Sequence, residues 1–126
     1  MNRAEYFKLN KKKIFVVGGS GLIGTNLCVL LADLGAKVFN LDITNKKKNK
    51  KKINFFKFDV SKIKFIEKNL KELFKKFGTP DVLINCSYPT TIDWTSGSFL
   101  KVTEKLINKN LNLQLNTYIW IARLVA

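Results

Sequence analysis

Residues 14–27 read IFVVGGSGLIGTNL, an apolar run that four glycines interrupt before the sequence turns apolar again. The β-branched and aromatic residues of Ile14–Val17 predict a short buried strand. Residues 22–34 predict a helix, because apolar side chains recur there at helical spacing: Ile23, Leu27, Leu30, Leu31 and Leu34. Gly35 follows at the position where a glycine often ends a helix. The glycine-rich stretch therefore joins a strand to a helix.

Three of the glycines each have an expected use. Gly18 permits a tight turn, Gly21 lets the backbone approach a ligand without a Cβ in the way, and Gly24 lets the helix pack closely. The N-terminus of a helix presents unpaired N–H groups and a partial positive charge, which suit a pyrophosphate. This loop is therefore a candidate site for the phosphates of a dinucleotide.

Later apolar runs at residues 37–42, 53–60 and 81–87 predict three further strands. Amphipathic stretches following Ser61 and Thr103 predict two further helices, because serine and threonine are good N-caps. Strands of continuous apolar character that alternate with helices indicate an α/β fold, with a doubly wound parallel sheet covered on both faces. About four strands are expected, and the polar run KKKNKKK is expected to form a solvated loop.

The charge of the chain is strongly positive, with 23 Lys and Arg residues against 9 Asp and Glu, a net charge of +14. Such a balance can indicate nucleic-acid binding. The basic residues are mostly lysines spread over ordinary helix faces, whereas nucleic-acid surfaces usually add arginines and exposed aromatic residues. Compositional drift is therefore preferred over nucleic-acid binding.

Several other classes of protein are disfavoured. The chain has no histidine, and Cys28 and Cys86 lie far apart in apolar segments, so neither a metal site nor a disulfide is expected. No apolar run approaches the roughly 18 residues of a membrane-spanning helix. The N-terminal residues lack the apolar centre of a secretory signal, so a cytoplasmic location is expected.

Asp42 ends the second expected strand and follows Gly24 by 18 residues. A carboxylate there would accept hydrogen bonds from an adenosine ribose diol and would repel a 2′-phosphate. This favours NAD as the cofactor, although the lysines at 46–52 keep NADP open as the alternative. Asp42 could also be an ordinary solvated turn residue.

Four segments together resemble the short-chain dehydrogenase/reductase family: VGGSGLIG (17–24), FDVS (58–61), NCSY (85–88) and NLNLQLNTYIW (110–120). The resemblance implies a Rossmann-like fold that is incomplete here. LINCSYP (83–89) is also similar to a bacterial subgroup associated with flagellin and surface-sugar modification.

The resemblance implies roles for individual residues. Asp59 and Val60 would contact adenine, and Asn112 would be the helix asparagine that orders a proton-relay water, with Asn110 as the rival position. Asp59 could instead merely precede the Ser61 cap. The pyrophosphate loop would comprise Gly18, Ser20, Gly21, Leu22, Ile23 and Gly24. The strand end beside the nicotinamide ribose would comprise Asn85, Cys86 and Ser87. The substrate wall would comprise Tyr88, Thr90 and Trp94.

The family's catalytic Tyr-x-x-x-Lys pair is missing from these 126 residues. The residues four positions after Tyr6, Tyr88 and Tyr118 are Asn, Ile and Ala. We therefore expect residues 1–126 to be the N-terminal part of a single NAD(P)-binding domain that stops inside the family's fourth helix. The whole enzyme would transfer hydride between the nicotinamide and a carbonyl/alcohol pair, with a sugar as one candidate substrate, and would form a homo-oligomer.

Two alternatives stay open from the sequence. One is a non-catalytic module that binds a dinucleotide through the same glycine loop. The other is a basic nucleic-acid-binding protein, in which the lysines themselves carry the function.

Overall fold

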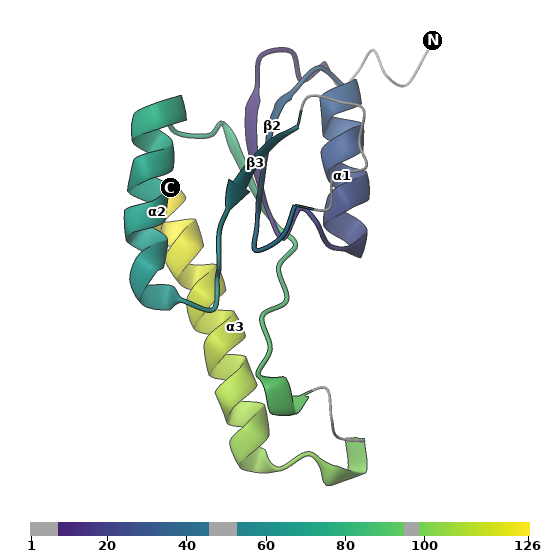
Figure 1. Cartoon of the computed structure of the whole chain (residues 1–126), viewed down its shortest axis with the longest axis vertical. Coiled ribbons are helices and arrows are strands. Elements are labelled where there is room, and N and C mark those ends of the chain that lie inside the picture. Colours follow the sequence, from purple (N-terminus) through teal and green to yellow (C-terminus); the bar gives the residue numbers. More distant parts are fainter. Residues whose placement is uncertain (1–7, 46–52, 95–98) are drawn as a thin grey trace.

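The computed structural model describes residues 8–45, 53–94 and 99–126; the KKKNKKK segment lies outside this part of the chain. Four parallel strands form one sheet in the order β3-β2-β1-β4. Figure 1 shows the sheet between α1 on one side and the pair α2 and α3 on the other, which confirms the expected doubly wound arrangement. The strands are β1 (Lys13–Val17), β2 (Lys37–Asp42), β3 (Asn54–Lys57) and β4 (Val82–Asn85).

The central strand β1 is buried on both faces, which explains its unbroken apolar sequence. Ile14 and Val16 pack with residues of the first helix, whereas Phe15 and Val17 pack on the opposite face with the other two helices. Phe15 pairs with Phe39 of β2 on one side and with Leu83 of β4 on the other. Alternation along one strand therefore builds two separate hydrophobic layers.

Three α-helices cover the sheet: α1 (Leu22–Asp33), α2 (Ile63–Phe77) and α3 (Glu104–Val125). Thr103 caps α3 as expected, since its Oγ1 accepts a hydrogen bond of 3.2 Å from the backbone N–H of Leu106. Two short 3₁₀ helices, η2 (Ile92–Trp94) and η3 (Phe99–Lys101), precede α3. None of the described helices is long and apolar enough to cross a lipid bilayer.

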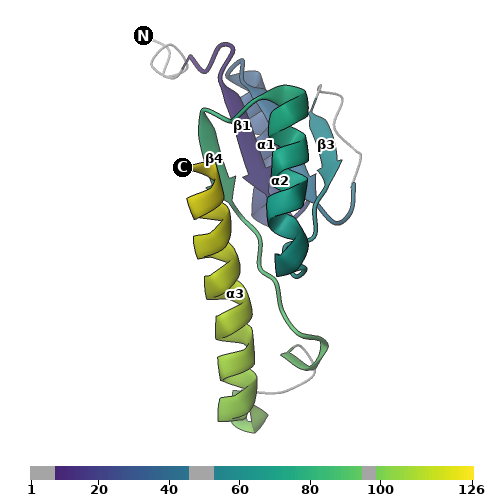
Figure 2. The same ribbon diagram turned by 90° about the vertical axis from the view of Figure 1, so that its left-hand side faces the viewer.

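The strand order reverses direction at β1, since β2 lies on one side of it and β4 on the other. In open parallel sheets a crevice forms beyond the carboxyl ends of the strands at such a point, and ligands bind there. In Figures 1 and 2 the C-terminal part of α3 lies beside the sheet, while its N-terminal part extends past it beside the segment that follows β4.

The expected apolar stripe of α1 is partly wrong. Ile23 and Leu30 are 72% and 54% exposed, whereas Cys28 and Leu31 are buried. The helix turns the face that carries Gly24, Cys28 and Leu31 toward the sheet. A Cβ on Gly24 would lie only 2.2 Å from the carbonyl oxygen of Gly18, so the helix sits directly on the glycine loop. This close approach sets the rotation of α1.

Three other expectations need correction. Strand β3 ends at Lys57 rather than at Val60, and β4 spans Val82–Asn85 rather than residues 81–87. Lys62, not Ser61, is the N-cap of α2, and it makes no side-chain capping bond. The Ser61 hydroxyl instead donates to the carboxylate of Asp59 at 2.6 Å, because these two residues form their own local turn.

Candidate functional site

A cavity of about 590 Å³ opens at the carboxyl ends of β1, β2, β3 and β4, around the point where the strand order reverses. This volume falls within the usual range for a small-molecule or cofactor site. Most of the residues proposed from the sequence line it: Gly18, Gly21, Leu22, Ile23, Asp42, Asp59, Val60, Cys86, Ser87, Tyr88 and Thr90. The sequence interpretation missed five further lining residues, which flank the same strand ends: Leu41, Ile43, Phe58, Ser61 and Pro89.

The glycine loop forms one wall of the cavity. Gly18 has a φ of +75°, and its N–H donates to the carbonyl oxygen of Leu41 at 2.8 Å. Gly21 is the N-cap of α1, and a Cβ on it would meet only the carbonyl oxygen of Gly18, at 3.3 Å. The first turn of α1 carries no acidic residue, and no side chain of the described residues caps the helix. The first N–H groups of the helix are therefore free to bind an anion.

Asp42 lines the cavity directly beside the glycine loop. Its Oδ2 accepts a hydrogen bond of 2.9 Å from the backbone N–H of Ser20, which fixes the carboxylate. Within the described residues, its Oδ1 accepts a single long bond of 3.4 Å, from the N–H of Thr44. One carboxylate oxygen is thus held by the protein, while the other retains capacity for ligand hydroxyls.

Ser20, proposed from the sequence as part of the pyrophosphate loop, does not line the cavity. It is buried; its hydroxyl donates to the carbonyl oxygen of Thr44 at 2.6 Å and accepts from the Asn40 amide at 2.9 Å. A Cβ on Gly19 would lie 2.5 Å from Asn40 Oδ1, so that position must be small. This network ties the glycine loop to the end of β2.

The strand ends β3 and β4 carry the same local turn. One side-chain oxygen of Asp59 accepts from the N–H and the hydroxyl of Ser61, at 3.0 and 2.6 Å. Asn85 holds Ser87 through bonds of the same two lengths. Asn85 and Gly24 do not line the cavity; both shape the backbone around it.

Neither cysteine is placed as a nucleophile. Burial raises the pKa of the Cys28 thiol to about 11, with smaller contributions from Cys86 and Asp42. Burial also raises the pKa of Cys86, which lines the cavity. Both thiols therefore stay protonated near neutral pH, where a thiol is a weak nucleophile.

The expected substrate wall is only partly assembled. Tyr88 and Thr90 line the cavity, whereas Trp94 lies outside it and donates from its ring N–H to the Tyr88 hydroxyl at 3.2 Å. Asn112 is exposed on α3 and does not line the cavity, while its rival Asn110 is 1% exposed and is bonded to Thr91. In the described residues, therefore, Asn110 faces the segment after β4 and Asn112 does not.

The model of the short chain dehydrogenase family matches residues 12–126. Among curated proteins, the chain is similar to post-translational flagellin modification protein A of Campylobacter coli, with 27% identity over 121 residues. That match covers 88% of this chain and 47% of the relative. The chain thus spans about half the length of this relative.

Solved structures share the fold at low sequence identity. Ligand-free aldohexose dehydrogenase of Thermoplasma acidophilum superposes with a TM-score of 0.75 at 21% identity, over 94% of this chain and 44% of that enzyme. A short chain dehydrogenase of Leptospira borgpetersenii with bound NAD⁺ gives a TM-score of 0.73 at 23% identity, over 99% of this chain and 48% of that protein. With the glycine loop, the strand order and the family match in agreement, the chain belongs to the short-chain dehydrogenase family.

Proposed function

We propose that this chain binds NAD in the cavity at the carboxyl ends of its strands and is the cofactor-binding half of an NAD-dependent oxidoreductase. The observation that carries the proposal is that the N-terminus of α1, which has no side-chain cap among the described residues, and the Asp42 carboxylate line the same cavity. The side chain missing at Gly21 leaves the backbone open to a pyrophosphate.

The remaining cavity residues fit the two ends of a dinucleotide. Ile43 and Val60 offer apolar contacts for adenine beside Asp59, while Cys86, Ser87 and Tyr88 stand toward the nicotinamide end. The preference for NAD rests on Asp42, because a carboxylate binds a ribose diol and repels the additional phosphate of NADP. When bound, the cofactor supplies the hydride acceptor or donor.

For the whole enzyme we propose a carbonyl/alcohol substrate, with a sugar as the favoured class. Support comes from the names of two similar proteins, a flagellin modification protein and an aldohexose dehydrogenase. Within this chain Tyr88 and Thr90 would contact the substrate. Asn112 remains the candidate for ordering a catalytic water. It is exposed on α3 among the described residues, so the other groups that would hold this water are proposed to belong to the rest of the whole enzyme.

We also propose that the whole enzyme self-associates. A row of apolar side chains on α3 is exposed at four-residue spacing: Ile107, Leu111, Leu115 and Ile119. An exposed apolar row of this kind is typical of an interaction surface. Sedimentation of the wild type and of Leu115→Gln would test this, because a weaker association is expected for the variant.

The test of the cofactor proposal is a fluorescence titration of the chain with NADH and with NADPH. Wild type should bind NADH saturably and more tightly than NADPH. Asp42→Ala should weaken NADH about tenfold or more, since charge-assisted hydrogen bonds to the ribose are lost, and should narrow the preference over NADPH.

Glu72→Gln is the matched control, because Glu72 is an exposed acid on α2 that does not line the cavity. It removes the same charge and should leave both affinities unchanged. Absence of saturable NADH binding by the wild type would reject the proposal. An unchanged preference in Asp42→Ala would reject the role given to Asp42.

A further inference from the structure

Three side chains of α3 bind the segment that follows β4. The Tyr118 hydroxyl donates to the carbonyl oxygen of Ser87 at 2.7 Å. The Gln114 amide donates to the carbonyl oxygen of Pro89 at 3.2 Å. The Asn110 side chain binds Thr91. We call these three pairs, Tyr118–Ser87, Gln114–Pro89 and Asn110–Thr91, the polar clamp.

The spacing of the polar clamp is regular on both sides. Its helix residues are four apart, which is about 6 Å along a helix axis. Its partners are two apart, which is about 6.6 Å along an extended chain. The two repeats match, so the segment can run antiparallel to α3 and be held at every second residue. Tyr88 and Thr90, the residues between the anchored ones, line the cavity, as do the anchored Ser87 and Pro89.

Asn110 makes the most complete contact of the three. Its Oδ1 accepts from the N–H of Thr91 at 2.9 Å, and its amide donates to Thr91 Oγ1 and to the carbonyl oxygen of Leu106, each at 3.0 Å. The Asn110 side chain is almost fully buried. Asn110 therefore binds both the backbone and the side chain of Thr91 and fixes the orientation of that residue, which a purely apolar contact could not do.

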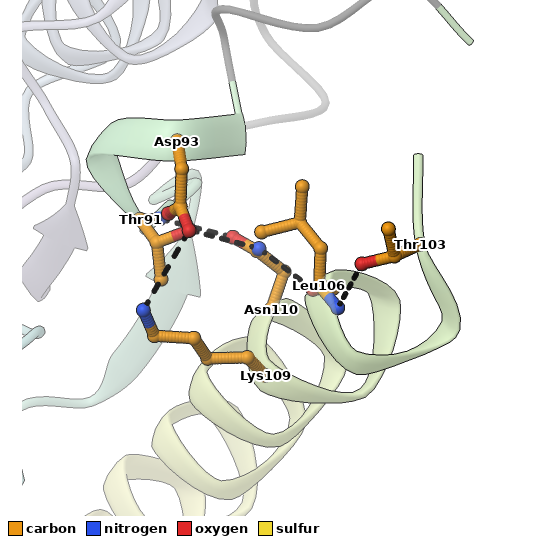
Figure 3. Close-up of polar contacts among 6 residues, drawn as sticks. All are labelled: Thr91, Asp93, Thr103, Leu106, Lys109 and Asn110. Atoms are coloured by element: carbon orange, nitrogen blue, oxygen red, sulfur yellow. Dashed lines mark hydrogen bonds and ion pairs between the residues drawn. The ribbon is translucent and has the colours of Figure 1, made fainter. Parts of the chain in front are cut away.

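The charged side chains of Asp93 and Lys109 lie beside the Asn110–Thr91 pair, as Figure 3 shows. A hydrogen bond from the Thr91 side chain is the main cause of the lowered pKa of Asp93. Lys109, next to Asn110 on α3, lies 3.8 Å from the same carboxylate. The Thr91 hydroxyl thus donates to Asp93 and accepts from Asn110, and this fixes its orientation.

We propose that Asn110 is a positioning residue that, through the polar clamp, sets the place of Tyr88 and Thr90 in the cavity wall. It acts through Thr91 and touches no ligand itself. The clamp's effect on ligands rests on the proposed cofactor function, whereas its effect on the segment does not. Loss of the clamp should release the wall on the substrate side and leave the glycine loop and Asp42 in place.

The test is NMR of the ¹⁵N-labelled chain, with and without NADH. Asn110→Ala should speed exchange of the Thr91 amide about tenfold, as expected for the loss of one or two hydrogen bonds, while β1 amides keep their rates. Asn116→Ala is the matched control, because Asn116 is exposed on the same helix and gains the same helix propensity. In Thr91→Ser the amide at position 91 should exchange at the wild-type rate, because the hydroxyl is kept. In Thr91→Val its exchange should speed up by less than in Asn110→Ala, because only the side-chain bonds are lost.

With NADH, the wild type should show shifts at Gly21 and Asp42 and at Tyr88 and Thr90. Asn110→Ala should keep the first pair of shifts, keep NADH affinity within about twofold and lose the second pair. Retained shifts at Tyr88 and Thr90 would overturn the proposal, and so would loss of all four shifts together.

The proposed function and the clamp fail separately. If wild type does not bind NADH, the cofactor proposal falls, and the exchange rates alone judge the clamp. Selective acceleration at Thr91 then supports it, and an unchanged Thr91 rate overturns it. Should Asn110→Ala fail to fold, Thr91→Val tests the clamp instead, by the exchange rate of the amide at position 91 and by the NADH-induced shifts at Tyr88 and Thr90.

Discussion

A Cβ placed on Gly18 would lie 2.6 Å from the backbone nitrogen of Ser87 and 2.7 Å from its Cα. The turn after β1 and the turn after β4 are therefore in direct backbone contact. The N–H of Cys86 also donates to the carbonyl oxygen of Val17 at 2.8 Å, which continues the pairing of the two strands to this point. The floor of the cavity is thus built from two backbone segments that leave no room for a side chain between them.

Gly18→Ala and Gly21→Ala should separate stability from binding. Gly18→Ala combines a φ of +75° with a backbone clash, so it should lower the free energy of unfolding by about 2 kcal/mol or more. Gly21 has a φ of −73°, and a Cβ there would meet only the Gly18 carbonyl oxygen, at 3.3 Å, so Gly21→Ala should lower the free energy of unfolding by less than Gly18→Ala does, by about 1 kcal/mol or less. Gly21→Ala should still weaken NADH binding, because its methyl group intrudes on the phosphate path. Denaturant unfolding measures the free energy of unfolding of each variant, and NADH titration measures its affinity. An equal loss of stability in Gly18→Ala and Gly21→Ala would contradict this account.

Tyr118→Phe should destabilise the fold by about 1 kcal/mol, since it removes the hydrogen bond to Ser87. Burial, and then the nearby Tyr88, raise the pKa of Tyr118 above its usual 10.0. The folded state thus favours the neutral phenol; this contribution is full below pH 10 and is lost as the pH rises through the folded pKa. Unfolding measured between pH 8 and 11 should show a shallower alkaline decline in Tyr118→Phe. A decline as steep as that of wild type would contradict the prediction.

The two cysteines should differ in reactivity toward iodoacetamide. Cys28 is buried and has a pKa of about 11, so at pH 8 only about one thiol in a thousand is ionised. Cys86 is only partly buried and lines the cavity, so it should be alkylated first. Mass spectrometry of timed samples would follow both sites, and Cys86→Ala should leave a single slow site. NADH should slow the labelling of Cys86; equal rates for the two thiols in the folded protein would count against the assignment.

Asp81 should contribute to stability at neutral pH and lose that contribution in acid. Its Oδ2 accepts from the N–H of Lys13 at 2.7 Å, and this bond is the main cause that lowers the pKa of Asp81 below 3.8. A lowered folded pKa means that the contribution is present above the unfolded value and disappears as the pH falls through the folded one. Asp81→Asn should therefore reduce stability at pH 7 and show a weaker dependence between pH 5 and 2. Glu72→Gln is the control for removing an acid, and an Asp81→Asn profile parallel to wild type would refute the prediction.

The sequence alone was sufficient for the fold class and for the chemistry of one wall. The apolar runs predicted all four strands of the described sheet. For β1 and β2 the reason is burial on both faces, which needs an unbroken apolar sequence. The glycines predicted the turn from β1 to α1, because the φ of +75° at Gly18 and the contact at Gly24 exclude larger residues. These features depend on near neighbours in the chain, so local sequence encodes them.

Only the tertiary structure decided which side chains face the cavity. Helical periodicity did not show how α1 is rotated against the sheet, and Ile23 and Leu30 proved exposed because Gly24 sets that rotation. Likewise, Asn110 and Asn112 have the same chemistry and differ by two positions, about 200° around a helix. The choice between them depends on Thr91, which lies 19 residues away in sequence and meets Asn110 only when α3 packs beside the segment after β4. A hydrogen bond over that separation follows from packing, and packing is a property of the folded chain as a whole.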